Sequence, residues 1–153
     1  MRLILAVAIA AMPFAALADD DDDNPIHQAI EARHGYYLML ARNMETLAGM
    51  AKGDTPYDEA VASRAGANIE ALTHYDLPSL FIEGSAHGQA DDSDAKPEIW
   101  TNMDDFKAKF AGLQQAATGA AEAVKGGQDK VGPVVGKLGA ACKACHDSFR
   151  EKS

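Results

Sequence analysis

The stretch that decides the fold is Gly139-Ala140-Ala141-Cys142-Lys143-Ala144-Cys145-His146, near the C-terminal end of the 153-residue chain. It contains the only two cysteines of the sequence, spaced as C-x-x-C, and a histidine directly follows the second. Residues three and four apart share one face of a helix, so a helical stretch would point both thiols and the imidazole the same way. This pattern is typical of a c-type haem attachment site, in which two cysteines form thioethers with one porphyrin and the histidine binds its iron.

Three other uses of the motif are disfavoured. A structural zinc site needs about four ligands, usually from two such pairs, and the chain has no second pair. A thioredoxin-like redox motif would lie near a βαβ pattern, whereas the flanking residues here indicate helix. A disulfide between Cys142 and Cys145 would leave His146 without a role. We therefore expect one covalently attached haem c per chain, with His146 as the proximal ligand of its iron.

The first 18 residues are typical of a secretory signal peptide. Arg2 supplies the positive charge, residues 3–14 form the apolar segment, and Ala16-Leu17-Ala18 is a small-x-small cleavage site. A membrane anchor is disfavoured because the apolar run is shorter than the roughly 20 residues that span a bilayer. We expect a periplasmic domain of residues 19–153 without a membrane anchor, which agrees with the attachment of haem c outside the cytoplasm.

The charge of the chain limits its partners. It carries 14 Lys and Arg against 23 Asp and Glu, and removal of Arg2 with the signal peptide takes the formal charge from −9 to −10. A surface of this sign disfavours binding to nucleic acid and to anionic lipid. It suits small-molecule ligands, or redox partner proteins that present a basic patch.

The rest of the chain predicts four helices, at residues 25–52, 56–75, 97–125 and 128–151. Caps delimit the first, with Asn24 before Pro25 at one end and Gly53 at the other. Its expected core face recurs at spacings of three and four: Ile30, Arg33, Tyr37, Leu40, Met44, Leu47 and Ala51.

Residues 77–95 form a long connection rather than a helix. We expect its apolar stretch Leu80-Phe81-Ile82 to pack against one end of the helices, and Asp91, Asp92 and Asp94 to be solvated. No stretch of the sequence shows convincing strand alternation. The prediction is an all-α, antiparallel up-down four-helix bundle with its haem near the C-terminus.

Several motifs place the chain near a known family. They are Glu31 to Tyr37, Asn43-Met44, Lys96 to Trp100, and Gly139 to His146 followed by Phe149-Arg150. Over residues 24–153 the sequence resembles the class II cytochromes c, and among them most closely the cytochrome c′ family. The C-terminal place of the haem motif separates this class from ordinary cytochromes c, and the resemblance implies the same four-helix bundle.

The resemblance implies roles for three residues around the haem. Arg33 places a cation at a core position, where it needs an anion; the family implies a haem propionate, and an acidic side chain is the alternative. Arg150 follows His146 by four residues and would lie beside the proximal ligand, unless it is only a solvated cation at the helix end. Trp100 would pack near the haem edge, with ordinary core packing as an equal alternative.

Tyr37 decides what the iron can do. It follows Arg33 by one turn, at a position that carries a bulky apolar or aromatic residue in five-coordinate relatives and methionine in six-coordinate, low-spin ones. A phenol with a pKa near 10 is a poor ligand at neutral pH, so we expect an open sixth position screened by the ring. Leu40 would continue this distal wall. Met39 should point away from it, and His34 lies off the core face.

Two functions follow from these expectations. The first is a five-coordinate, high-spin haem protein that binds NO and CO. The alternative is a six-coordinate, low-spin carrier that only exchanges electrons with redox partner proteins. The sequence offers no distal acid–base pair such as His with Arg, so we do not expect an enzyme. It leaves monomer and homodimer both open.

Overall fold

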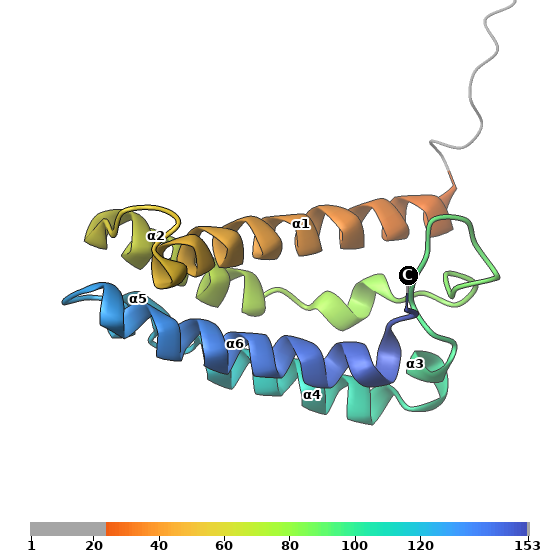
Figure 1. Cartoon of the computed structure of the whole chain (residues 1–153). Helices are drawn as coiled ribbons and strands as arrows, with labels where there is room; N and C mark the ends of the chain where they lie inside the picture. The colour runs from red at the N-terminus through yellow and green to blue at the C-terminus, as the bar shows by residue number, and fades with distance from the viewer. Residues whose placement is uncertain (1–23, 153) are drawn as a thin grey trace, which may run out of the picture.

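The computed structural model describes residues 24–152; the predicted signal peptide of residues 1–18 lies outside this range. Its helices follow in this order: α1 (Pro25–Lys52), α2 (Glu59–Thr73), the 3₁₀ helix η2 (Leu77–Leu80), α3 (Glu98–Thr101), α4 (Met103–Ala117), α5 (Ala120–Ala123) and α6 (Gln128–Phe149). The helix α1 packs on α2 and α6, and α4 packs on α6 and α2 (Figure 1). The described residues contain two isolated β-bridges and no strand. The prediction of an antiparallel four-helix bundle is confirmed.

Local signals determine the bounds of α1. The side chain of Asn24 accepts a hydrogen bond from the Ile26 N–H at 2.9 Å, and Pro25 occupies the first helical position. The helix ends at Gly53, whose φ of 81° is left-handed and suits glycine. Both ends agree with the sequence prediction, because each depends on residues within one turn of the end.

The second helix begins three residues later than predicted. Its cap is Asp58, whose carboxylate accepts the Val61 N–H at 2.9 Å, rather than the Thr55-Pro56 pair. Its small residues permit close packing, as expected. A Cβ added to Gly66 would lie 2.8 Å from the backbone nitrogen of Ala121, so α2 and α5 approach too closely for any side chain there.

The predicted continuous helix over residues 97–125 is wrong. It is interrupted at Asn102, which has φ −132° and ψ 42°, and again at Thr118 and Gly119. Gly119 adopts a left-handed φ of 73°, which turns the chain before α5. The apolar spacing continues through both interruptions, because α3, α4 and α5 all face the same core, and the breaks are therefore invisible to periodicity.

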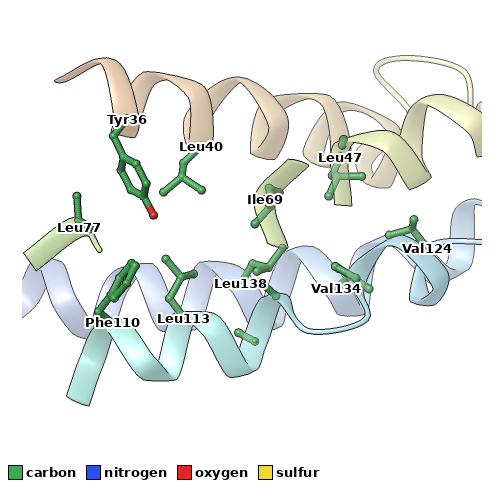
Figure 2. Packing of buried hydrophobic residues seen from close by; sticks show 14 of the residues in the cluster. Tyr36, Leu40, Leu47, Ile69, Leu77, Phe110, Leu113, Val124, Val134 and Leu138 are labelled. Carbon is green, nitrogen blue, oxygen red and sulfur yellow. The ribbon is translucent and has the colours of Figure 1, made fainter. Parts of the chain in front are cut away.

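The core lies between two helix layers, one formed by α1 and α2 and the other by α4 and α6. Figure 2 shows Tyr36 and Leu40 pointing from α1 toward the opposite layer, where Phe110 and Leu113 of α4 and Leu138 of α6 lie. At one end of the bundle the connection contributes aromatic packing, as predicted. Phe81 is buried against Phe106, with ring centroids 4.7 Å apart, and Phe106 in turn contacts Phe149 at 5.5 Å.

Candidate haem site

The cysteine–histidine motif lies in the C-terminal half of α6. Cys142 and Cys145 are free thiols, half-buried, and pack against the hydrophobic core. Burial raises the pKa of both thiols, that of Cys145 to about 11, so they are protonated at neutral pH. Their packing places both sulfurs on the core-facing side of α6.

His146 is the more exposed member of the motif. Partial desolvation by its neighbours, with a smaller contribution from the charge of Arg150, lowers the pKa of its imidazole below the ordinary value. A lowered pKa favours the neutral ring, and neutral imidazole is the form that binds metals. The chemistry of the three side chains thus fits two thioether bonds and one iron ligand.

Two tyrosines of α1 face this motif. Tyr36 is buried, and its hydroxyl donates a hydrogen bond to the Leu72 carbonyl at 3.1 Å. The Tyr37 ring meets it edge-on, with centroids 5.5 Å apart. Although 37% of Tyr37 is exposed, desolvation raises the pKa of its hydroxyl well above the ordinary value, and the proximity of Cys145 raises it further. The Tyr37 phenol therefore stays neutral.

No role was predicted for Tyr36 from the sequence. Tyr36 lies three residues after Arg33 and four before Leu40, whereas Tyr37 lies four after Arg33 and three before Leu40. Both spacings fit the core face of α1, so the pattern could not distinguish the two tyrosines. The structure buries Tyr36 within the core and leaves Tyr37 at its margin. Leu40 is buried, as expected of a distal wall residue.

Arg33 is buried, with 3% of its surface exposed. Its guanidinium donates to the Ser85 hydroxyl at 3.2 Å, the Ser85 carbonyl at 3.1 Å and the Ser93 hydroxyl at 3.4 Å, and its Cζ lies 4.7 Å from the centre of the Phe81 ring. Within residues 24–152 no carboxylate forms an ion pair with it, so the acidic side chain considered as its partner is not found. A buried cation held only by neutral oxygens suits an added anion such as a propionate.

Arg150 lies just beyond the end of α6 rather than within it, but its charge still acts on the His146 imidazole, as expected of a residue beside the proximal ligand. Its contact with the haem stays a prediction. The helix ends at Phe149, and Arg150 is extended, with φ −115° and ψ 134°. Its side chain, half exposed, pairs with the Asp94 carboxylate at 3.2 Å. Asp94 is exposed, as expected of a solvated loop charge, and it has a partner that the sequence did not predict. Sequence spacing could not reveal this pair, because its members lie 56 positions apart.

Trp100 supplies an unused hydrogen-bond donor. Its ring meets Phe81 edge-on at 6.2 Å, and its indole nitrogen is buried without an acceptor among the described residues. A buried N–H without a partner is unfavourable and requires an explanation. A propionate oxygen would satisfy it, so Trp100 and Arg33 both fit the polar edge of a haem.

The other candidate ligands on α1 face outward. Half of the Met39 surface is exposed, and so is half of the His34 side chain, which approaches Glu31 at 3.8 Å. Neither lies in the core beside Tyr37.

Comparison with known proteins identifies the family. The family model described as "Cytochrome C'" matches residues 28–150. The chain belongs to the cytochrome c′ family. It is 41% identical over 150 residues to the cytochrome c-554 of Cereibacter sphaeroides, covering 98% of this chain and 95% of the relative. It is 38% identical over 151 residues to the cytochrome c′ of the same organism, covering 99% and 98%.

The fold of a solved relative agrees. A cytochrome c′ structure from Rhodobacter superposes with a TM-score of 0.80 at 37% identity, covering 84% of this chain and 98% of that one. As a member of the cytochrome c′ family, the chain is a haem c protein of the kind that binds small gases or transfers electrons. Because it has only two cysteines, the covalent attachment has no side chains other than Cys142 and Cys145 to use. In the described part, no helix is both long and apolar enough to cross a membrane.

Proposed function

We propose that the iron of this haem c protein takes one protein ligand, His146, and keeps an open sixth position behind Tyr37, where it binds NO and CO. The single observation that carries the proposal is the neutral phenol of Tyr37 beside the haem-attachment face of α6. Its raised pKa means that no phenolate is present to bind the iron at neutral pH.

The surroundings of Tyr37 support the same reading. Met39, the nearest thioether along α1, is half exposed, and His34 is turned to solvent beside Glu31. When bound, the haem supplies an iron that changes between ferric and ferrous and accepts diatomic ligands. Four side chains would hold it in place: Cys142 and Cys145 through thioethers, and Arg33 and Trp100 by donating hydrogen bonds to its propionates. Tyr36 and Leu40 keep the space beside Tyr37 apolar and narrow.

A relative supports the choice of ligand. One solved structure is titled as the nitric oxide complex of a single-residue variant of the Alcaligenes xylosoxidans cytochrome c′, and that protein is 29% identical to this chain over 85% of its length. We propose the same class of ligand for the present chain.

The exposure of His146 also favours electron exchange with a redox partner protein. A basic patch on that partner would bind the acidic surface of this chain.

We propose a binding and electron-transfer role without catalysis. General acid–base work on a bound ligand needs a side chain of suitable pKa within hydrogen-bond reach. The residues we place on the distal side, Tyr37 and Leu40, offer only a phenol of raised pKa and a hydrocarbon.

The domain we assign to the periplasm is residues 19–153, after removal of the signal peptide.

We also propose that α1 and α2 pair with a second copy of the chain. Leu38, Met39 and Tyr75 are each at least half exposed and line one groove between these helices, together with Leu72 and Leu80. Exposed apolar side chains gathered in one place mark an interaction surface. One relative's structure is titled for a ligand-controlled dimer dissociation.

The spin state of the ferric protein tests the function. We expect high-spin or mixed-spin optical and electron paramagnetic resonance spectra at neutral pH. A purely low-spin spectrum would reject the open sixth position and favour the six-coordinate electron carrier.

A further inference from the structure

The connection between η2 and α3 is fastened to two distant elements. On one side Arg33 of α1 donates to Ser85 and Ser93. The Ser93 hydroxyl also donates to the Ser85 carbonyl at 2.7 Å, which closes the loop on itself. The guanidinium of Arg33 therefore fixes the course of the chain into Asp94.

On the other side the connection joins the end of α6. The Lys96 N–H donates to the Phe149 carbonyl at 3.0 Å, and the Glu151 N–H donates to the Asp94 carbonyl at 2.8 Å. Between them, Ala95 and Arg150 form an antiparallel bridge. The Asp94–Arg150 ion pair completes this contact, which we call the C-terminal clasp: residues 94–96 with residues 149–151.

The clasp reaches the iron ligand through one further bond. The Arg150 N–H donates to the His146 carbonyl at 3.1 Å, so the residue held by Asp94 also closes the helical turn that carries His146. The last turn of a helix frays readily, because its carbonyl groups lack partners within the helix. Here the turn ends in backbone bonds and an ion pair to a segment that α1 itself holds in place.

We propose that Asp94 is a positioning residue for the proximal side of the haem. It holds the Arg150 guanidinium and the last turn of α6, and through them it sets the orientation and the electrostatic surroundings of His146. The inference rests on the proposed role of His146 as the iron ligand. Asp91 and Asp92 are exposed residues of the same loop, and within residues 24–152 their carboxylates form no hydrogen bond or ion pair. Asp94 differs from them by its position beside Arg150, so we assign the positioning role to its contact with Arg150 and not to its charge alone.

The experiment compares Asp94→Asn with Asp91→Asn in the haem-loaded protein. Both variants remove one negative charge from the same loop, but only Asp94→Asn removes the partner of Arg150. We expect hydrogen exchange of residues 147–152 to become about two- to fivefold faster in Asp94→Asn, the range of a half-exposed ion pair, and to stay unchanged in Asp91→Asn. We also expect the reduction potential to rise more in Asp94→Asn, because the positive charge of Arg150 is then uncompensated near the iron and favours the ferrous state.

A double-mutant cycle with Arg150→Gln separates positioning from simple charge loss. If Asp94 acts through Arg150, adding Asp94→Asn to Arg150→Gln leaves exchange unchanged and shifts the potential only as far as Asp91→Asn does, whereas Asp94→Glu alone, which keeps the carboxylate, stays close to the wild type in both. Additive effects, or identical behaviour of the Asp94 and Asp91 variants, would overturn the inference. A wild-type spectrum without a histidine-ligated c-type haem would instead reject the proposed function, whatever the variants show.

Discussion

Tyr37 of α1 lies close enough to Cys145 of α6 that a charge on the thiol would raise the pKa of the phenol, second only to burial in its effect. The two residues belong to opposite ends of the chain and to different helix layers. Their proximity places the ring that we propose screens the iron beside one of the two haem attachment points. On this proposal, the helix that bears Tyr37 controls access to the haem.

Replacing the Tyr37 ring should change ligand binding without changing the fold. Tyr37→Ala removes a side chain from the margin of the core, and we expect carbon monoxide to bind the ferrous protein on the order of tenfold more tightly, which corresponds to ~1.4 kcal/mol of relieved steric hindrance. Flash photolysis measures the matching increase in association rate. The control Tyr75→Ala removes an exposed ring that packs on Tyr36, with centroids 6.1 Å apart, and so separates loss of the Tyr37 ring from loosening of the tyrosine cluster; it should leave binding unchanged. Equal binding by the wild type and Tyr37→Ala would show that this ring is not the barrier.

Tyr37→Met tests the same position by adding a ligand instead of removing an obstacle. If Tyr37 stands over the iron as proposed, a thioether at this position should reach it, so the ferric spectrum should shift toward low-spin. Tyr37→Leu, of similar bulk but without sulfur, should remain high-spin. A low-spin spectrum in both variants would contradict the explanation.

Arg33→Leu should destabilise the bundle and let the haem propionate take up a proton at accessible pH. The variant loses three hydrogen bonds to Ser85 and Ser93, and we expect the free energy of unfolding to fall by about 1–3 kcal/mol. Without the guanidinium, the reduction potential should depend more strongly on pH. Arg33→Lys keeps the charge but loses the planar fork, and we expect an intermediate effect. A potential and a stability unchanged in Arg33→Leu would remove Arg33 from the site.

The sequence was most informative where structure depends on neighbouring residues. The cap and glycine signals of α1 predicted both of its ends, and the C-x-x-C-H spacing placed both thiols on the inner side of α6. It was least informative where distant segments meet. The break at Gly119 accompanies the close approach of α5 to Gly66, and the extended Arg150 depends on Asp94. Neither contact leaves a periodic trace in the sequence.

Tyr36 should make the bundle sensitive to alkaline pH. Burial raises the pKa of Tyr36 to about 12 in the folded protein, against an ordinary value near 10. The stability contributed by its neutral hydroxyl is therefore complete below pH 10 and is lost as the pH rises toward 12. Tyr36→Phe should cost about 1 kcal/mol at pH 7, because the Leu72 carbonyl loses its donor, and this difference should shrink above pH 10. Denaturant unfolding at pH 7, 10 and 11 measures it, with the exposed Tyr75→Phe as a control. A constant difference across this range would contradict the assignment.

Leu38→Glu tests the proposed dimer surface. A charge in the groove between α1 and α2 should be incompatible with an apolar interface, so sedimentation should give a monomer at concentrations where the wild type is a dimer. Gln115→Glu adds the same charge to an exposed position of α4 and should leave the assembly unchanged. A wild type that is monomeric at all concentrations, or a dimer that tolerates Leu38→Glu, would count against this surface.

The most direct test of the account is a carbon monoxide titration of the ferrous wild-type protein, followed in its optical spectrum. An open sixth position behind Tyr37 predicts a high-spin spectrum that converts to that of a single carbon monoxide complex, one ligand per haem. A ferrous spectrum that is already low-spin, and that carbon monoxide does not change, would contradict the central claim and assign the chain to the six-coordinate electron carriers.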